Sequence, residues 1–438
     1  MNPIAESLNR ELQVAAEPIF DMLSDVGKKL FFPKGILTQG AEAKEKAYHM
    51  NATVGIATDA LGIMHLPSVM ECIGALAPEK SITYAPSFGL PELRQIWHQS
   101  LMQKNPSLDG KTISLPVVSS GITHGISVFA DLWLDPEDAV ILPDPMWGNY
   151  SMIFSVRKGA GIRTYPLFSG DMRYNIEAFE AAVKEEAATR SKIVVLLNFP
   201  HNPSGYTLSR EEAKRTAEIL IEAAASGTNV VAALDDSYFG LFYEEETLKE
   251  SMFALLTGSH PRLLAVKLDG ATKENFVWGL RVGFITYGCT VDGDSAAVCD
   301  ILEKKTAGCV RGSISNASHL SQSIVLASMK NMAFASEKAE KFEVMRRRAR
   351  RVRQVLADPR YQSAWEVYPF NSGYFMCLRP RGVDAEQLRI HLLEKYGIGV
   401  IAIGNRDLRV AFSCLEEDQI PELFETVYKG VQELSGSE

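Results

Sequence analysis

The sequence predicts an α/β fold, with a large domain built on a mostly parallel sheet flanked by helices and a smaller α+β domain. Short β-rich runs alternate with longer helical patterns through the middle of the chain, which is typical of such a sheet. The 438 residues, 46% of them apolar, leave room for two or three domains with substantial cores. The strands expected in the sheet are 116–119, 139–142, 193–198, 230–235, 264–267 and 284–287.

The C-terminal part of the chain has a different pattern, which predicts the second unit. Residues 322–356 are helical in pattern and charged, and the strands expected near them are 367–378, 400–403 and 408–412. We therefore expect a large domain over 61–324 and a small domain made of 1–60 and 325–438. The sequence has no long Gly/Ser or Pro linker between the two, so they should pack tightly.

Charge and composition exclude several classes of protein. With 45 basic and 54 acidic side chains the net charge is −9, which disfavours sequence-independent binding of nucleic acid. The apolar runs are about a strand long, far below the roughly 20 residues of a membrane helix. The N-terminal segment lacks the pattern of a targeting peptide, so the cytoplasm is the expected location. Six cysteines lie far apart without companion histidines, which disfavours a metal site and predicts small buried thiols.

The densest charge run is a set of six arginines between Arg346 and Arg353, with Glu337, Glu340 and Glu343 upstream. On a helix, acids one turn before bases are typical of a solvated face whose charges pair with one another. We expect such a face here, and a nucleic-acid or membrane patch is the alternative.

Two motifs follow apolar strands at the edge where α/β proteins place their ligands. The first is 199–205 (FPHNPSG), in which two prolines and a glycine fix an irregular turn and leave Asn202 as a rigid amide donor. The second is 235–238 (DDSY), which places the Asp235 carboxylate at the rim of the sheet near the phenol of Tyr238. A buried carboxylate requires a cation or several hydrogen bonds. A helix N-cap is an alternative role for Asp235.

Two further motifs supply an amine and an anion site. Lys273 follows an expected strand, and Arg281 lies between glycines in 279–283 (GLRVG). A partly desolvated lysine beside another cation has a depressed pKa and can bond covalently to a carbonyl group, although a surface lysine is the alternative. The stretch 119–125 (SSGITHG) leads from a strand into a helix whose free backbone N–H groups suit a phosphate. The turn that supplies them consists of Gly121, Ile122 and Thr123.

Together these motifs supply the groups that pyridoxal phosphate requires: a phosphate cradle, an amide, a carboxylate near a phenol, and an amine that bonds to the aldehyde. In this set and order the sequence resembles the class I aminotransferases that use this cofactor, specifically the aspartate and aromatic amino acid group. The resemblance runs from about residue 51 to about residue 412. It implies the fold type I architecture of pyridoxal-phosphate-dependent transferases, with seven strands in the large sheet.

The resemblance extends to two more motifs. The stretch 84–90 (YAPSFGL) matches the family's Tyr-x-Pro-x-x-Gly-Leu, which implies that Tyr84 reaches across a dimer interface to the cofactor phosphate. The stretch 145–149 (PMWGN) matches Pro-x-Trp-x-Asn, which implies that Trp147 stacks on the pyridine ring.

The resemblance also implies the catalytic roles. Lys273, Asp235 and Tyr238 are the expected catalytic residues: Lys273 bonds to the cofactor aldehyde, and Asp235 pairs with the ring nitrogen. Tyr238 and Asn202 are expected to hydrogen-bond the cofactor's phenolic oxygen. The residues expected to hold the phosphate are Arg281, Thr272, Gly121, Ile122 and Thr123. The residues expected to contact the substrate are Arg409, which grips the α-carboxylate, with Arg311, Asn202 and Trp147.

Two positions depart from the family pattern. The family usually has a phosphate-binding serine three residues before the lysine, whereas this chain has Gly270, which leaves more of the phosphate contacts to Thr272 and the turn at Gly121. The arginine that reads a substrate's distal carboxylate falls on Arg311, but 311–318 (RGSISNAS) lacks both prolines of the family motif. The loop that carries Arg311 is therefore expected to differ from that of the family.

The resemblance implies an aminotransferase that moves the amino group of an L-amino acid, aspartate or an aromatic one, to a 2-oxo acid such as 2-oxoglutarate. Lys273 is expected to take the α-proton, and two half-reactions predict ping-pong kinetics. Because Tyr84 and Arg311 are expected to serve the neighbouring subunit's pocket, we expect a two-fold homodimer with composite sites. We expect no metal, nucleic-acid or membrane partner. A β-lyase or decarboxylase is the alternative enzyme, and a non-catalytic ligand sensor is the alternative of another class.

Overall fold

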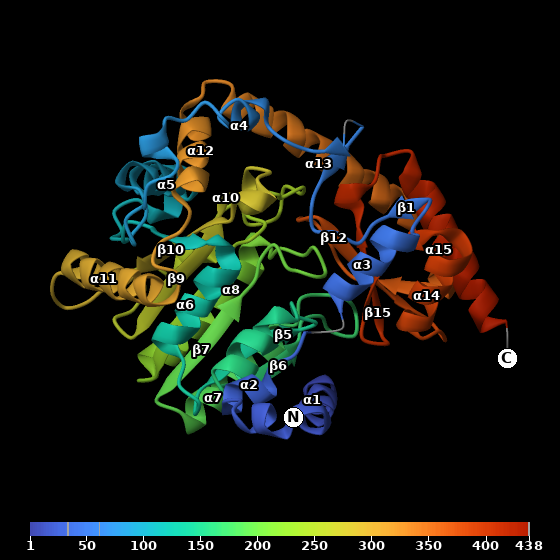
Figure 1. Cartoon of the computed structure of the whole chain (residues 1–438), viewed down its shortest axis with the longest axis horizontal. Coiled ribbons are helices and arrows are strands. Elements are labelled where there is room, and N and C mark those ends of the chain that lie inside the picture. The colour runs from blue at the N-terminus through green and yellow to red at the C-terminus, as the bar shows by residue number, and fades with distance from the viewer. Residues whose placement is uncertain (33–34, 61, 437–438) are drawn as a thin grey trace.

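A seven-stranded mixed sheet forms the centre of the computed structural model, which describes residues 1–32, 35–60 and 62–436 (Figure 1). Its strand order is β4-β10-β9-β8-β7-β5-β6, and β10 runs antiparallel to both of its neighbours while the other strands are parallel. The predicted α/β class is confirmed. The strands are β4 (Val117–Ser120), β5 (Ala139–Asp144), β6 (Gly161–Pro166), β7 (Lys192–Leu197), β8 (Asn229–Asp235), β9 (Leu263–Gly270) and β10 (Val282–Gly288).

Helices cover both faces of this sheet, as the alternation of buried side chains along β7 shows. Val195 and Leu197 pack into the core beneath α7 (Ile176–Thr189) and α8 (Arg210–Ala225). Val194 and Leu196 pack into the opposite core beneath α6 (Gly121–Trp133). Because every second residue points to the same face, a strand buried on both faces has a continuous apolar sequence. The strand missing from the sequence prediction, β6, lies at the sheet edge and lacks such a run.

The parallel strands bring the sequence motifs together. Strands that run in the same direction end at the same edge of the sheet, and ligands bind there in open α/β folds. The residues at those ends are Ser120 of β4, Asp144 of β5, Leu197 of β7, Asp235 of β8 and Gly270 of β9. The 119–125 motif contains Ser120, the 235–238 motif begins at Asp235, and the 199–205 motif and Lys273 follow Leu197 and Gly270 by two and three residues.

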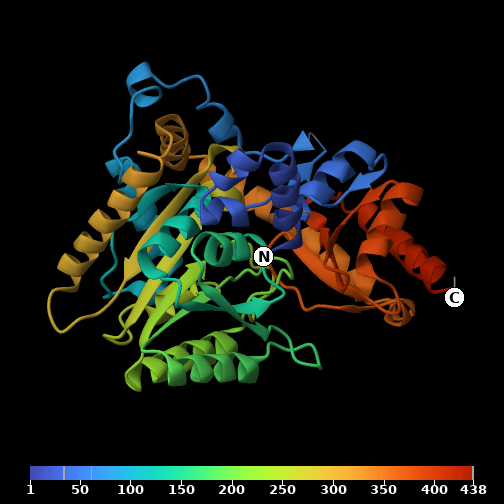
Figure 2. The same cartoon turned by 60° about the horizontal axis from the view of Figure 1, so that its bottom comes forward.

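A second, four-stranded antiparallel sheet lies to one side of the large sheet, in the elements coloured orange to red in Figures 1 and 2. Its order is β11 (Trp365–Val367), β12 (Phe375–Pro380), β15 (Asp407–Ala411) and β14 (Ile401–Ile403). The short strand β1 (Met50–Asn51) pairs in parallel with β13 (Ile398–Gly399), which joins the segment around residue 50 to this unit. The helices of this unit are α13 (Phe334–Leu356), α14 (Ala385–Tyr396) and α15 (Gln419–Ser435). The domain boundaries themselves stay a prediction.

The prediction of one strand over 367–378 is wrong, because this stretch contains the end of β11, a turn and most of β12. Between the two strands the backbone N–H groups of Asn371 and Ser372 both donate to the Gly205 carbonyl at 2.9 Å. These hydrogen bonds connect the turn to the 199–205 motif of the large sheet. Gly373, at φ +71°, then reverses the chain into β12.

The remaining described helices and short strands lie outside the two sheets. None of the described helices is long and apolar enough to cross a membrane.

Of the six cysteines, predicted to be buried, Cys289, Cys299 and Cys377 are buried and the other three are half-buried. The helices not yet named are α1 (Pro3–Asp21), α2 (Asp25–Lys29), α3 (Ile36–Lys46), α4 (Pro67–Met70), α5 (Pro91–Lys104), α9 (Met252–Leu256), α10 (Ala271–Glu274), α11 (Ser295–Ser313) and α12 (His319–Lys330), and the short strands are β2 (Thr58–Asp59) and β3 (Gly62–Ile63).

The arginine-rich part of α13 is only partly the solvated face that the sequence predicted. Arg346 pairs with Glu343, and Arg347 pairs with Glu417, both near the surface. Arg348, in contrast, is fully buried. Its guanidinium donates to the carbonyl oxygens of Thr58 and Ser413 at 2.7 Å and pairs with Glu416 at 2.9 Å. The prediction is wrong for Arg348 because the partners of its guanidinium come from distant parts of the chain.

We predict that Arg348→Met lowers the free energy of unfolding by about 2–4 kcal/mol, because two buried carbonyl groups lose their donor. Chemical denaturation followed by circular dichroism measures this change. Arg347→Met is the matched control and should change stability by less than about 1 kcal/mol, since its ion pair is exposed to solvent. Equal effects of the two substitutions would contradict this account of Arg348.

Candidate active site

The motif residues line one cavity at the carboxyl edge of the large sheet. The phosphate-motif residues Ile122 and Thr123 lie on α6, and Thr272 and Lys273 lie on α10, which follows β9. Arg409, on β15, enters from the smaller sheet. The residues that line the cavity are Ile36, Gly55, Ile122, Thr123, Trp147, Tyr150, Asn198, Asn202, Asp235, Ser237, Tyr238, Thr272, Lys273, Arg281, Phe375 and Arg409.

Asp235 is the buried anion of the cavity, with 2% of its surface exposed. Its Oδ2 accepts a hydrogen bond from the Tyr150 hydroxyl at 2.5 Å. Its Oδ1 accepts from the Ser237 hydroxyl at 2.5 Å and from the Ser237 backbone N–H at 3.1 Å. The Asn198 amide donates to the Asp235 carbonyl at 2.9 Å and fixes the end of β8. These donors are neutral, so they orient the carboxylate and stabilise its charge without cancelling it.

Lys273 is the amine of the cavity, and its Nζ lies 5.0 Å from the centre of the Tyr238 ring. Burial, opposed by the negative charge of Asp235 and assisted by the positive charge of Arg281, lowers the pKa of this amine to about 8. The unprotonated, nucleophilic form is therefore accessible close to neutral pH. Burial also raises the pKa of Tyr238, so its phenol keeps its proton and can donate a hydrogen bond.

Arg409 is a buried cation held for a ligand on the side of the smaller sheet. Its Nη2 donates to the Thr53 carbonyl at 2.9 Å, and its Nη1 donates to Asn202 Oδ1 at 3.3 Å. The guanidinium stacks over the Phe375 ring with 4.1 Å between its carbon and the ring centre. Its Nε is buried without a hydrogen-bond partner. A buried donor that has no partner in the protein is suited to an incoming anion such as a carboxylate.

A second group of residues in the cavity, around Gly121 and Arg281, suits a larger anion. Gly121 begins α6 with φ +74°, and a Cβ at this position would lie 2.3 Å from Arg281 Nη2, so only glycine lets the guanidinium approach. Arg281 itself adopts the left-handed conformation, at φ +53°. Thr272 Oγ1 is buried without a partner. This helix N-terminus, cation and free hydroxyl fit the phosphate of pyridoxal phosphate.

The packing around Gly270 explains the departure from the family pattern. A Cβ at this position would lie 2.7 Å from the Val282 carbonyl and 3.0 Å from Gly283 Cα on the neighbouring strand. Gly283 in turn packs against the backbone of Gly121, where a Cβ would lie 2.6 Å from the carbonyl carbon. These three glycines let β4, β9 and β10 pack closely beneath the anion site. A serine at position 270 has no space in this arrangement.

The cavity of one chain contains most, but not all, of the expected site residues. Trp147, Asn202 and the other motif residues line it as described, with Gly121 directly beneath Arg281. Tyr84 does not line it and is 90% exposed. Arg311 does not line it either, because its Nη1 donates to Ser315 Oγ at 2.6 Å on the surface. Both residues are exposed on the surface of the described chain.

Sequence reasoning missed several residues that line the cavity. Tyr150 lies three residues after Trp147 and donates to Asp235. Ser237 lies two residues after Asp235, a spacing at which an aspartate side chain typically accepts a hydrogen bond from the backbone N–H. Asn198 directly follows β7 and supports Asn202 by accepting a hydrogen bond from its backbone N–H at 2.9 Å. Ser237 and Asn198 could have been found from the sequence by these local signals. Phe375 could not, because its contact with Arg409 is made in the folded chain alone.

Comparisons with known proteins identify the family. The model of the family described as aminotransferase class I and II matches residues 50–427. A probable aspartate/prephenate aminotransferase from Aquifex aeolicus is 26% identical over 375 residues, which cover 83% of this chain and 86% of the relative.

Solved structures share the fold. An aminotransferase from Anaerococcus prevotii superposes with a TM-score of 0.82 at 22% identity, covering 93% of this chain and 98% of that chain. The cytoplasmic aspartate aminotransferase of Saccharomyces cerevisiae superposes with a TM-score of 0.76 at 17% identity, covering 95% of this chain and 99% of that chain. At these identities the two structures establish the architecture and leave the substrate open.

We predict that Gly270→Ser lowers the free energy of unfolding by about 1–3 kcal/mol, because the added atoms overlap the neighbouring strand. It should also fail to strengthen binding of pyridoxal phosphate, although it restores the family's serine. Gly308→Ser on α11 is the matched control, since its Cβ would meet nothing within 4 Å. Thermal unfolding and titration with the cofactor measure both effects. A stable Gly270→Ser variant that binds the cofactor more tightly would refute the packing argument.

Proposed function

The chain belongs to the class I and II aminotransferase family, and on this premise we propose that it transfers the amino group of an L-amino acid to a 2-oxo acid with pyridoxal 5′-phosphate bound in the cavity described above. One observation carries the proposal: Lys273, an amine with a lowered pKa, and Asp235, a buried carboxylate, line the same cavity. That combination suits a cofactor that is both bonded covalently and kept cationic at its ring.

The residues of the cavity support one placement of the cofactor. Arg281, Thr272 and the first turn of α6 would bind its phosphate, and Asp235 would pair with its ring nitrogen. Trp147 would stack on the ring, while Asn202 and Tyr238 would donate hydrogen bonds to its phenolic oxygen. When bound, pyridoxal phosphate supplies an aldehyde that bonds to amines and a ring that takes up electrons from the α-carbon.

The chain's own part in the chemistry is to move a proton at Lys273 Nζ. With a pKa of about 8, this amine is available as a base near neutral pH, and it can take the proton from the substrate's α-carbon. As an ammonium it can then return the proton to the neighbouring carbon. The same steps in reverse, with a second oxo acid, complete a ping-pong cycle.

The substrate is proposed to bind by the group that every amino acid shares. Arg409 would hold the α-carboxylate with two parallel hydrogen bonds, one of them from its unpartnered Nε. Asn202 and Phe375 already fix the plane of the guanidinium. We propose aspartate, which the names of both relatives contain, or an aromatic amino acid as the donor, and 2-oxoglutarate as the acceptor. A cytoplasmic location also stays a prediction.

We further propose a two-fold homodimer with composite sites. Tyr84 and Arg311 are expected site residues, yet both lie outside the cavity of their own chain. Exposed apolar side chains, Ile82 and Ile314 among them, lie close in sequence to these two residues. A second copy that covers this surface would bring Tyr84 and Arg311 to its partner's cavity. We predict a dimer in sedimentation velocity, and a fully active monomer would contradict the composite site.

We predict that each half-reaction changes the absorbance of the bound cofactor when an amino donor and then a 2-oxo acid are added. Lys273→Ala should lower kcat by about 10⁴-fold, because both proton transfers lose their base. Lys304→Ala, which removes an exposed lysine of α11, is the matched control. A panel of amino donors identifies the substrate.

The same assay distinguishes an aminotransferase from a lyase or decarboxylase. An aminotransferase stops after one turnover when no acceptor is present, whereas a lyase continues to release product. Continued release of keto acid without an acceptor would refute the proposed reaction. A protein that binds no pyridoxal phosphate, or in which borohydride labels a residue other than Lys273, would refute the site.

A further inference from the structure

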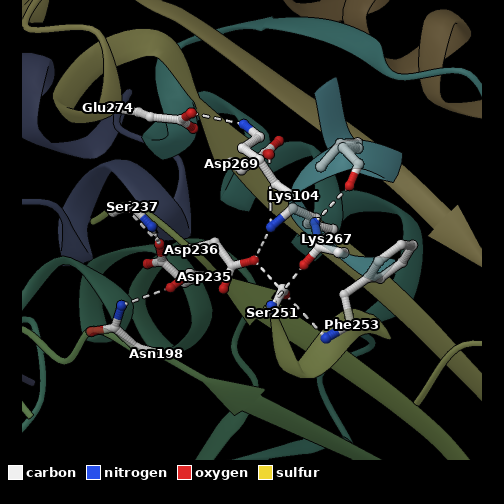
Figure 3. A network of polar contacts seen from close by, with 12 residues as sticks. Lys104, Asn198, Asp235, Asp236, Ser237, Ser251, Phe253, Lys267, Asp269 and Glu274 are labelled. Carbon is white, nitrogen blue, oxygen red and sulfur yellow. Dashed lines mark hydrogen bonds and ion pairs between the residues drawn. The ribbon is translucent and has the colours of Figure 1, made fainter. Parts of the chain in front are cut away.

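A buried network of charges lies directly behind the cavity (Figure 3). Lys267 on β9 is fully buried and forms an ion pair with Asp236, whose Oδ2 also accepts a hydrogen bond from Ser251 Oγ at 2.5 Å. The Lys267 ammonium also lies 3.7 Å from Asp269 Oδ2. Asp269 in turn accepts a hydrogen bond from the Trp97 indole N–H at 3.3 Å. Every charge in this cluster therefore has a charged or hydrogen-bonding partner.

A second cluster continues the network on the other side of Asp269. Glu274 is 8% exposed and binds two lysines, with Lys104 Nζ at 2.7 Å and Lys338 Nζ at 3.0 Å. Lys104 also lies 4.9 Å from the centre of the Trp97 ring, which connects the two clusters through α5. Three lysines balance three carboxylates across both clusters, so the desolvated charges compensate one another.

The network holds the chain neighbours of two of the proposed catalytic residues, Asp235 and Lys273. Asp235 lines the cavity, while Asp236, the next residue, binds Lys267. Lys273 lines the cavity, while Glu274, the next residue, binds Lys104 and Lys338. Each proposed catalytic residue is thus fixed from behind by the residue that follows it. The carboxylates of Asp236 and Glu274 form ion pairs within the network, and neither residue lines the cavity.

The Lys267 ion pair connects the two strands from which these residues emerge. Lys267 lies opposite Leu234, the residue before Asp235, in the parallel ladder of β8 and β9. The Asp236 backbone N–H continues that ladder by donating to the Leu268 carbonyl at 3.0 Å, one residue beyond the end of β8. The ion pair therefore crosslinks the end of β8 to β9 where the ladder stops. Beyond this point the backbone of Asp236 and that of Lys273 follow separate paths.

Stability alone is a weak reason for such a network. Replacing a buried ion pair by apolar side chains of similar size is often neutral or stabilising, because removing charges from water costs about as much as their attraction returns. Charged pairs differ from apolar ones in their directionality, since hydrogen-bonded ions accept only a narrow range of geometries. The constraint on position is therefore the distinctive property of the Lys267–Asp236 pair.

Resting on the proposed function, we propose that Lys267 and Asp236 are positioning residues of the reaction: their buried ion pair fixes the end of β8 to β9 and so holds Asp235 and Lys273 in their relative positions around the cofactor. Neither residue touches the cofactor or the substrate. Their effect is transmitted through the backbone to the residues on either side of the cavity.

The test compares Lys267→Met, Asp236→Asn and the double variant with the unchanged protein, all with the cofactor bound. Lys192→Met is the matched control, because Lys192 forms an ion pair with Asp138 at 2.6 Å at the opposite, amino edge of the same sheet. Four quantities are measured: the melting temperature, the Kd of pyridoxal phosphate for the apo protein, the visible circular dichroism of the bound cofactor, and kcat and KM.

We predict that each single variant loses stability, because one buried charge is left without its partner, and that the double variant regains most of it. The double variant should nevertheless bind pyridoxal phosphate about tenfold more weakly and show an altered visible circular dichroism. Its kcat should fall by about 10- to 100-fold with KM changed by less than about threefold, since small displacements near the reacting atoms slow the chemistry. Lys192→Met should leave the cofactor properties unchanged.

Three outcomes separate the possible failures. A double variant with restored stability and an unchanged Kd, spectrum and kcat would show that the pair only stabilises the fold, which overturns the proposal. If the Lys267 variants do not fold, Asp236→Asn decides, because it removes the negative charge of the ion pair and keeps the size of the side chain; an unchanged cofactor spectrum and Kd would then overturn the proposal. Failure of the unchanged protein to bind pyridoxal phosphate would instead refute the proposed function.

Discussion

A carboxylate buried at the end of a central strand, Asp235, imposes the constraint on which the site depends. Burying an anion costs several kcal/mol unless hydrogen bonds or a cation replace its water. The chain replaces that water with hydroxyl and N–H donors from Tyr150 and Ser237, and among the described residues no cation forms an ion pair with Asp235. The negative charge is thus oriented and left available to a ligand. A cofactor with a cationic ring nitrogen is complementary to such a site.

Other carboxylates at the same edge of the sheet form ion pairs, in contrast to Asp235. Asp236 and Glu274 are neighbours in sequence of Asp235 and Lys273, but both form ion pairs with lysines in the buried network. Side chains of successive residues point in different directions, so one backbone segment can serve the cavity and the scaffold at once. The charged residues of the cavity and the ion-paired residues of the network are therefore adjacent in sequence. The rigid ion pairs of the network limit the motion of the cavity residues.

The sequence was sufficient for the features that depend on local pattern. Strand periodicity predicted six strands of the large sheet, and turn residues after β7 and β8 indicated where Asn202 and Asp235 lie. Contacts between distant segments were not predictable in this way. Arg348 was predicted to be solvated because nothing near it in sequence reveals that Thr58 and Ser413 supply its partners. The Gly270 packing likewise requires the register of β9 against β10.

An aminotransferase handles two substrates in turn, and these share a carboxylate next to the reacting carbon while their side chains differ. In the proposed placement the cavity of one chain would bind the shared part, since Arg409 is buried, fixed by Asn202 and Phe375, and left with a free Nε. The expected reader of the variable part, Arg311, lies on the surface of the same chain. In the proposed dimer, recognition of the α-carboxylate would belong to each chain by itself, whereas selectivity between side chains would depend on the contact between two chains.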